Sequence, residues 1–412
     1  MRILFLYMFP LWGNGSGSYL RELSAELIKR GHTVGIVAPD KRKLEGRTMY
    51  PVKAPEAVFS GHPEWPKAKP LGEMKGKQLG DIYATYLHVS LTAVEDFKPD
   101  VIHVFHTAFL PEIGRTIKAL FGIRYIMTTH GSDLAYLVKD RRFIPLIADA
   151  NRGARYITAV SDFTKKWYFQ IFGYVIKRKT LVIPGGVDLS HFKRDEKLMA
   201  EIDKKYKLEG KKVVLFTGRL TKNKGVIYLV RAAEKIQGTI VIVGDGPERS
   251  NLEAEIKRRN LKNVLLVGYM QTSNPMYHAF YERANLYVSP SVWDEPLGLT
   301  ILEAMAARTS VVATRKGGVL SIINDGVNGT LIKARNSKEL GTVVNTLLLD
   351  DERRIKLRDN GYKTVIEKFA WAKIAQRFEK LYEDTRVKDK TVKASPLDKL
   401  VKKIFSPRFW LF

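Results

Sequence analysis

The sequence predicts an α/β protein with two parallel, doubly wound sheets, one in each of two domains. Short runs rich in valine, isoleucine and leucine alternate with amphipathic helical segments along most of the chain. This alternation favours parallel strands joined by crossover helices. The chain has 412 residues, which is too long for a single hydrophobic core. We therefore assign residues 1–188 to a first domain and residues 189–370 to a second, with a hinge near residues 184–192.

The expected strands are short apolar runs that end at a turn residue. In the first domain, residues 3–7 form a strand, residues 13–17 a glycine-rich loop and residues 19–30 an amphipathic helix. Later strands of this domain are expected at residues 33–38, 101–105, 125–129, 156–160 and 181–183. In the second domain we expect strands at residues 212–217, 239–243, 264–267, 286–289 and 310–313.

Composition excludes several kinds of chemistry and of location. The chain has no cysteine, which rules out disulfides, thiolate metal sites and a cysteine nucleophile. Residues 1–10 carry one early basic residue and lead into the glycine loop, so we expect a buried strand there rather than a signal peptide. No apolar run approaches the length of a membrane-spanning helix. These features are compatible with a cytoplasmic protein.

The net charge of +26 permits binding to nucleic acid, to an anionic membrane surface or to anionic substrates. The lysines and arginines are spread over most segments and often alternate with glutamates, as in residues 249–259. Many of them therefore belong to solvated helix faces. Because no helical segment carries clustered base-reading residues, we predict no nucleic-acid partner.

Residues 289–318 carry the strongest functional signal. Glu295 and Glu303 are separated by a turn that opens a helix, and a β-branched strand follows at residue 310. This order places Glu295 in a crevice above a parallel sheet and Glu303 on the first turns of the helix. Carboxylates accept hydrogen bonds from sugar hydroxyls, and the amides at the helix start favour an anion; these amides belong to Leu297, Gly298 and Leu299. The alternative is that both glutamates only complement the positive helix start.

This segment resembles the E-x7-E signature of the retaining, nucleotide-sugar-dependent glycosyltransferases of family 4. Those enzymes have the GT-B fold, in which two Rossmann-like domains face a central cleft. Further segments resemble the family in the same order, at residues 12–39, 128–134, 182–192 and 216–233. The resemblance implies that a helix at residues 371–385 crosses back to complete the first domain. It does not extend to residues 41–80, or to the basic and aromatic tail at residues 386–412.

Two cations lie in a glycine-bounded loop between a strand and a helix. Arg219 and Lys224 follow the strand at residues 212–217, and a guanidinium fork with an ammonium suits a diphosphate. The alternative is ordinary surface charge, of which Lys222 is an example. The resemblance implies that Arg219 and Lys224 neutralise the donor diphosphate and so stabilise the leaving group.

Two loops of the first domain are expected at the cleft. Gly15 and Gly17 lie in a glycine loop between a strand and a helix, which favours phosphate contact, although a tight turn without a ligand is the alternative. His130 follows the strand at residues 125–129, and strand carboxyl ends of open α/β sheets point at ligands. The resemblance implies that His130 contacts the donor sugar. Asp133 is its neighbour and is expected to cap the next helix.

The resemblance implies a complete reaction. A hexose moves from a nucleoside-diphosphate sugar to a saccharide or lipid-linked acceptor with retention of configuration. Transfer occurs on one face of the sugar, and the donor phosphate helps to deprotonate the acceptor. No cofactor and no metal are expected, since two cations replace the metal. The implied catalytic residues are His130, Arg219, Lys224 and Glu295. The implied donor-binding residues are Gly15, Gly17, Gly218, Arg219, Lys224, Leu297, Gly298, Leu299 and Glu303.

Two positions depart from the family pattern, and one recognition element cannot be read from side chains. Leu297 stands where phenylalanine is usual, and Gly185 stands where asparagine is common; we expect little effect from either change. Residues 267–270 match the place where family members hold the nucleobase through main-chain groups. The sequence therefore leaves the donor base open.

Two other classes of protein are alternatives. A dinucleotide-dependent oxidoreductase would use the glycine loop and Asp40, at the end of the second strand, as a ribose-binding acid. The glycine spacing is G-x-G-x-G rather than G-x-G-x-x-G, and the glutamates and cations of the second domain would have no role. A basic nucleic-acid-binding protein would explain the charge but none of the ordered motifs.

Two regions outside the resemblance suggest an anionic acceptor and a membrane contact. Residues 41–80 carry nine lysines and arginines with five prolines and Trp65, which we interpret as a long basic loop over the cleft mouth. A solvated mobile loop is the alternative. Residues 396–412 place Leu397, Val401 and Phe405 on one helical stripe among lysines, and Trp410 follows. This pattern suits peripheral attachment to the cytoplasmic membrane face, and docking on the protein itself is the alternative.

Overall fold

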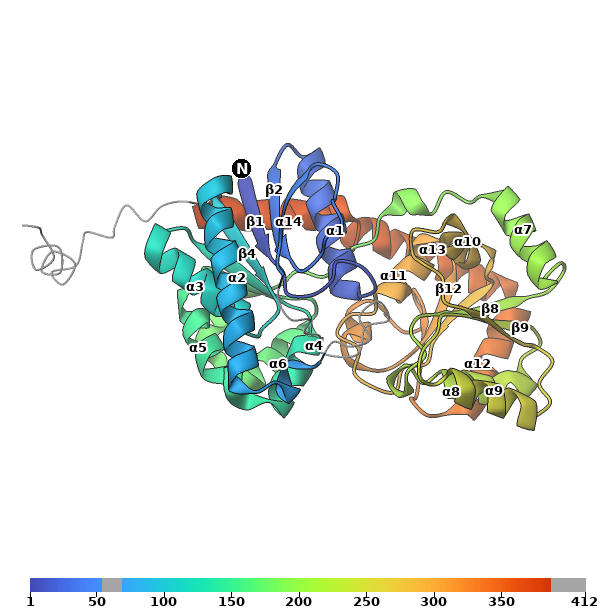
Figure 1. Cartoon of the computed structure of the whole chain (residues 1–412). Helices are drawn as coiled ribbons and strands as arrows, with labels where there is room; N and C mark the ends of the chain where they lie inside the picture. Colours follow the sequence, from blue (N-terminus) through green and yellow to red (C-terminus); the bar gives the residue numbers. More distant parts are fainter. Residues whose placement is uncertain (54–68, 387–412) are drawn as a thin grey trace, which may run out of the picture.

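The computed structural model describes residues 1–53 and 69–386. These residues form two α/β domains side by side, each with one parallel sheet flanked by helices (Figure 1). The predictions for Trp65 and for the tail at residues 387–412 lie outside the described residues. Within the described part, no helix is long and apolar enough to cross a membrane.

In the described residues, the first domain contains a seven-stranded parallel sheet in the order β3-β2-β1-β4-β5-β6-β7. Its strands are β1 (Arg2–Leu6), β2 (Thr33–Ala38), β3 (Arg47–Pro51), β4 (Val101–Phe105), β5 (Tyr125–Thr129), β6 (Tyr156–Ala159) and β7 (Thr180–Val182). Its helices are α1 (Gly15–Lys29), α2 (Gly76–Phe97), α3 (Leu110–Phe121), α4 (Ser132–Lys139), α5 (Ile144–Gly153) and α6 (Asp162–Phe172).

In the described residues, the second domain contains a six-stranded parallel sheet in the order β10-β9-β8-β11-β12-β13. Its strands are β8 (Val213–Thr217), β9 (Thr239–Val243), β10 (Val264–Gly268), β11 (Leu286–Ser289), β12 (Ser310–Thr314) and β13 (Thr330–Ile332). The helices from the linker onward are α7 (Glu196–Tyr206), α8 (Val226–Ala232), α9 (Arg249–Arg258), α10 (Pro275–Arg283), α11 (Leu299–Ala306), α12 (Ser337–Leu349), α13 (Asp351–Lys368) and α14 (Trp371–Arg386).

The interpretation of residues 41–80 as one long loop is wrong. Strand β3 pairs with β2, with Val34 opposite Arg47, and α2 begins at Gly76. β3 lies at the edge of the sheet and its residues are only half buried or exposed, so it lacks the apolar run that marks the central strands. The short strand β13 was also not predicted, and it too is an edge strand.

The last helix of the described residues, α14, packs on the first domain. Tyr382 of α14 hydrogen-bonds the ring of His103 on β4 (Tyr382 Oη to His103 Nδ1, 2.8 Å), and the other ring nitrogen of His103 lies 2.6 Å from Thr128 Oγ1 on β5. Trp371 at the start of α14 meets Tyr19 of α1 edge to face, with ring centroids 5.0 Å apart. Helix α14 therefore follows the second domain in sequence but contributes to the core of the first.

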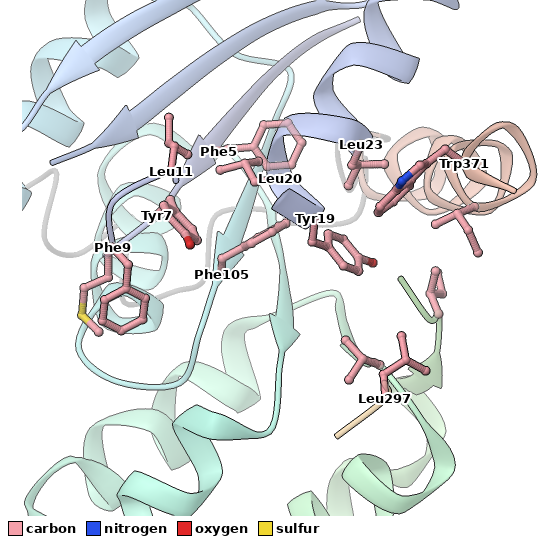
Figure 2. Close-up of a cluster of buried hydrophobic side chains, with 14 of the residues drawn as sticks. Phe5, Tyr7, Phe9, Leu11, Tyr19, Leu20, Leu23, Phe105, Leu297 and Trp371 are labelled. Atoms are coloured by element: carbon pink, nitrogen blue, oxygen red, sulfur yellow. The ribbon is translucent and has the colours of Figure 1, made fainter. Parts of the chain in front are cut away.

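One hydrophobic core joins the two domains. It runs from β1 and β4 through Tyr19 to Leu297 and to the buried face of α11. Figure 2 shows Tyr19 and Trp371 near Leu297 of the second domain. A second core fills the far side of the second sheet. The loops that carry the predicted site residues are therefore held between two packed units.

Candidate functional site

Glu295 lies in the loop between β11 and α11 and is buried, with 6% of its surface exposed. Its Oε1 atom accepts hydrogen bonds from Lys224 Nζ at 2.6 Å and from Ser291 Oγ at 2.6 Å. Burial alone would raise the pKa of Glu295, but the charge and hydrogen bond of Lys224, with the Ser291 hydrogen bond, hold it below its usual value. Glu295 is therefore an ionised, buried carboxylate with a fixed partner.

Glu303 lies on α11 and is held by two tyrosines of α10. Tyr281 donates to Glu303 Oε2 at 2.6 Å, and Tyr277 donates to the same oxygen at 3.1 Å. Burial raises the pKa of the Glu303 carboxyl, and the two tyrosine hydrogen bonds offset this only in part. No described hydrogen bond engages Glu303 Oε1. This oxygen is available to a ligand.

A cavity of about 530 Å³ separates the two domains on the hinge side, and Glu303 lines it. Leu299 lies beside Glu303, while Ser18 and Tyr19 of α1 face them from the first domain. The loop after β10 contributes Thr272 and Ser273. A cavity of this size accommodates a nucleoside. Glu295, Lys224 and His130 are not part of its lining, so the two glutamates lie in different parts of the cleft.

The loop before α11 is shaped by close backbone contacts. Gly298 has φ of 107°, in the left-handed region that favours glycine. Gly318 donates its amide to the carbonyl of Glu295 at 2.6 Å, and a Cβ on Gly318 would lie 2.0 Å from the Pro296 carbonyl oxygen. Among the described residues, the amides of Gly298 and Leu299 have no hydrogen-bond acceptor. These two amides therefore remain open at the start of α11.

The two predicted phosphate-binding cations occupy different settings on one loop. Lys224, in a single helical turn at Lys222–Lys224, forms the ion pair with Glu295. Arg219 is exposed. Gly218 sits where two backbones nearly touch, since a Cβ on Gly244 would lie 1.9 Å from the Gly218 carbonyl oxygen. The structure thus joins Lys224 to Glu295, a contact that the sequence did not predict.

His130 is buried at the carboxyl end of β5, with its ring among aromatic side chains. Its centroid lies 5.0 Å from that of Tyr19 and 4.9 Å from that of Phe105. Burial lowers the pKa of His130 to about 3, so the imidazole is neutral. Its Nε2 atom is buried without a hydrogen-bond partner in the described structure. A neutral imidazole of this kind suits a ligand hydroxyl.

Asp133 organises the His130 loop, but the prediction that it caps the next helix is wrong: it lies in the first turn of α4, whose N-cap is Gly131 without a side-chain cap hydrogen bond. It is fully buried and accepts hydrogen bonds from the amides of Gly131 at 2.7 Å and Thr107 at 2.9 Å. Burial raises the pKa of Asp133, against the lowering effect of these hydrogen bonds. Asp133 thereby fixes the backbone that presents His130.

The His130 loop meets the Glu295 loop directly. A Cβ on Gly131 would lie 2.6 Å from Pro296 Cβ, so only glycine permits this approach. Ser161, at the start of α6, donates a hydrogen bond to the Pro296 carbonyl oxygen at 2.5 Å. His130 and Glu295 therefore lie in two loops that touch across the domain boundary.

The glycine loop of the first domain differs from the prediction. The helix α1 begins at Gly15, so Gly15 and Gly17 are helical residues and not loop residues. The amide of Gly17 donates to Asn14 Oδ1 at 2.7 Å, and a Cβ there would lie 2.4 Å from the Leu11 carbonyl oxygen. Because the side chain of Asn14 caps the helix, the helix begins earlier in the sequence than predicted. Gly17 is therefore a packing glycine, whereas Gly15 is exposed and faces Leu299 across the cleft.

Asp40 has a structural role in place of the ribose-binding role of a dinucleotide site. It accepts a hydrogen bond from the amide of Leu11 at 3.1 Å and pairs with Arg42 at 3.1 Å. Its carboxylate is thus occupied by the protein. The residue that an oxidoreductase would need is not available.

Several further residues that shape the site were not predicted from the sequence. His106 follows β4 and its ring lies 4.9 Å from that of His130. The same reasoning that selected His130, a polar residue at a strand carboxyl end, would have found it. Ser291, Tyr277 and Tyr281 carried no such signal, because their role depends on contacts between separate elements. Within residues 1–53 and 69–386, no cluster of three or more His, Asp or Glu residues could hold a metal ion.

Comparisons with known proteins agree with this architecture. Residues 13–191 match the family described as Glycosyltransferase Family 4, and residues 199–364 match Glycosyl transferases group 1. An uncharacterized glycosyltransferase of Methanocaldococcus jannaschii is 31% identical over 290 residues, covering 69% of this chain and 75% of that protein. A second uncharacterized glycosyltransferase of the same organism is 27% identical over 390 residues, covering 90% and 94%.

The structural likeness concerns the fold. HepE from Anabaena, solved in complex with UDP and glucose, superposes with a TM-score of 0.74 at 21% identity, covering 92% of this chain and 99% of HepE. The two parallel sheets facing a common cleft define the GT-B class of fold. Within that class, the chain belongs to the family 4, or group 1, glycosyltransferases. It is a glycosyltransferase, as the resemblance predicted.

Proposed function

We propose that this enzyme transfers a hexose from a nucleoside-diphosphate sugar to a saccharide or lipid-linked acceptor, with retention of configuration and without a metal. The observation that carries the proposal is the separation of two buried carboxylates. Glu303 lines a cavity of nucleoside size, while Glu295 lies in the loop that meets His130. One carboxylate is placed for a ribose and the other for the transferred sugar.

The donor fits this arrangement through complementary hydrogen bonds and charge. Glu303 Oε1 accepts from the ribose hydroxyls, while the tyrosines hold Oε2. The amides of Gly298 and Leu299, with Arg219 and Lys224, receive the diphosphate. Lys224 is paired with Glu295 at 2.6 Å. When the diphosphate binds, Lys224 pairs with it instead. The oxygens of Glu295 can then accept hydrogen bonds from sugar hydroxyls.

Transfer breaks the bond between the anomeric carbon and the diphosphate, and the diphosphate departs with the electron pair. The acceptor hydroxyl attacks from the same face, and its proton passes to an oxygen of the departing phosphate. Lys224 and Arg219 compensate the negative charge that develops on the leaving group. His130 remains neutral and hydrogen-bonds a hydroxyl of the sugar.

The test of the proposal is a transfer assay with radiolabelled UDP-, GDP- and ADP-hexoses. HepE binds UDP and glucose, which makes UDP-glucose the first donor to try. We expect one sugar nucleotide to be hydrolysed or transferred and to raise the melting temperature by mass action. The anomeric configuration of the product is read by NMR. Inverted product, or no turnover and no thermal shift with any donor, would contradict the proposal.

We expect the activity to be independent of divalent metal. Two cations, Arg219 and Lys224, supply the charge that a metal would bring to the diphosphate. Treatment with EDTA should leave the transfer rate largely unchanged. The control is the same assay with added Mg²⁺ or Mn²⁺. Loss of activity in EDTA that Mg²⁺ restores would show that these cations do not replace a metal.

We propose that the acceptor is anionic, for example a sugar phosphate or lipid phosphate. The basis for this proposal is the group of basic residues in segment 41–80. Two of these residues already have partners in the protein: Arg42 pairs with Asp40, and Arg47 donates a hydrogen bond to Ser24. Lys41 and Lys43 remain exposed. We expect a phosphorylated acceptor to show a higher kcat/KM than its neutral analogue. Equal kcat/KM values for the phosphorylated acceptor and its neutral analogue would contradict the proposal of an anionic acceptor.

A further inference from the structure

Exposed apolar side chains gather at the edge of the first sheet that lies opposite the cleft. Val175 is 91% exposed and Tyr174 is 68% exposed, both in the short 3-10 helix Tyr174–Lys179 that leads into β7. At the end of α3, Leu120 is 64% exposed and Phe121 is also exposed. These segments precede the amino ends of β7 and β5, whereas the cleft lies at the carboxyl ends of the strands.

Two lysines tie these segments together. Lys118 of α3 donates to the carbonyl of Gly153 at 2.9 Å, and Lys179 donates to the carbonyl of Ala154 at 3.0 Å. The end of α3 and the segment Tyr174–Lys179 therefore meet at the end of α5. In Figure 1 both α3 and α5 lie at the outer end of the first domain, away from the second domain. We call the exposed set of Leu120, Phe121, Tyr174 and Val175 the outer patch.

The outer patch is rimmed by positive charge that the protein does not neutralise. Lys177 and Arg178 are exposed and form no ion pair within the described residues. The nearby carboxylates are already engaged by arginines: Asp149 with Arg115, Asp384 with Arg155 and Asp100 with Arg386. This face thus presents apolar and aromatic groups beside unpaired cations.

The chain also leaves the described structure at this edge. The helix α14 ends at Arg386, which lies 3.6 Å from Asp100, the residue just before β4. The residues that follow in the sequence, 387–412, carry seven lysines and arginines against two aspartates, together with Trp410 and two phenylalanines of the last four residues. The same combination of cations and aromatic residues therefore continues from the outer patch into the sequence beyond it.

We propose that the outer patch is a contact surface for anionic lipid. An aromatic ring and a branched apolar side chain beside cations suit the boundary between headgroups and acyl chains, and Lys177 and Arg178 complement the negative surface. A folded acidic protein would need a broad apolar surface to pack against. The outer patch is instead a short surface segment whose apolar side chains extend into solvent.

This surface sets the orientation of the cleft. Strands of five residues span about 17 Å, so the Glu295 loop lies at least that far from a membrane held at the outer patch. A lipid-linked acceptor must then present its reacting hydroxyl on a polar portion longer than about 17 Å. Of the anionic acceptors proposed above, a lipid phosphate would therefore fit only if it carries such a polar portion. The orientation is independent of the donor chemistry proposed above.

The test is cosedimentation of the full chain with phosphatidylglycerol/phosphatidylcholine vesicles at low and high salt. We expect Tyr174→Ser/Val175→Ser to lower the bound fraction at both salt concentrations. Lys177→Glu/Arg178→Glu should weaken binding about tenfold or more at low salt, and less at high salt. Matched controls in the second domain are Leu349→Ser, at a residue 64% exposed, and Arg353→Glu/Lys356→Glu, both exposed. These controls should bind like the unchanged chain.

Several outcomes would overturn the proposal. Binding that survives both outer-patch variants but is lost from a chain ending at Arg386 would assign membrane contact to residues 387–412 alone. Absence of binding by the unchanged chain would exclude a lipid partner. Self-association in the absence of lipid that the outer-patch variants abolish would identify a second copy as the occupant. Unchanged melting temperature and donor turnover in solution show that each variant is folded.

Discussion

Replacing Lys224 by alanine is expected to lower the turnover number by about 100- to 1,000-fold. In the proposed mechanism, Lys224 is one of two cations that compensate the charge of the departing diphosphate, and it holds Glu295 through the 2.6 Å ion pair. Both effects act on the transition state, so KM for the donor should change much less than kcat. Steady-state kinetics with the donor identified by the transfer assay would measure this.

The matched control is Lys222→Ala in the same loop. Lys222 is exposed and forms no ion pair among the described residues, so its removal should leave kcat unchanged. Wild-type turnover in a folded Lys224→Ala variant would show that Lys224 does not bind the diphosphate. An equal loss in both variants would instead point to the overall charge of the loop.

The same substitution should change the pH dependence of stability. The pKa of Glu295 is held below its usual value in the folded enzyme, so its ionised form stabilises the fold above about pH 4, and this contribution is lost as the pH falls. Without Lys224, burial raises the pKa instead. Lys224→Ala should therefore lose on the order of 1–3 kcal/mol at neutral pH, and the difference from wild type should shrink at acid pH. Urea unfolding at several pH values would measure it.

Replacing Glu303 by alanine is expected to raise the donor dissociation constant by roughly 5- to 150-fold, equivalent to about 1–3 kcal/mol. The charge-assisted hydrogen bonds to the ribose are lost, while the chemical step at the sugar is untouched. Isothermal titration calorimetry with the intact donor and with the free nucleoside diphosphate should show the same loss for both ligands. A loss of affinity for the sugar nucleotide but not for the nucleoside diphosphate would show that Glu303 does not bind the ribose.

Two variants separate ribose binding from packing. Tyr281→Phe keeps the carboxylate but removes its 2.6 Å hydrogen bond, so donor affinity should fall less than in Glu303→Ala. Glu22→Gln removes another carboxylate that lines the same cavity from α1 and should leave affinity unchanged. If Glu22→Gln weakened the donor as much as Glu303→Ala, the general charge of the cavity and not a ribose contact would explain the effect.

Much of the fold could be predicted from the sequence because the central strands are continuous apolar runs. Strands β4, β5, β9 and β11 match the predicted ranges, since each is buried on both faces of a parallel sheet. The edge strand β3 was missed because its residues are half buried or exposed and form no apolar run. The edge strand β13 is buried but was missed because it has only three residues. The start of α1 was predicted too late, because the capping side chain of Asn14 allows glycines to enter the helix.

The sequence alone determined the family, the two-domain architecture and the identity of Glu295, Glu303, Lys224 and His130 as candidates, because ordered motifs survive as local patterns of residue type. Only the tertiary structure decided how these residues are used. It paired Lys224 with Glu295, which are 71 positions apart, anchored Glu303 on two tyrosines, and buried His130 as a neutral ring. Such pairings depend on which loops meet at the carboxyl edges of two sheets, and burial then fixes the protonation of each group.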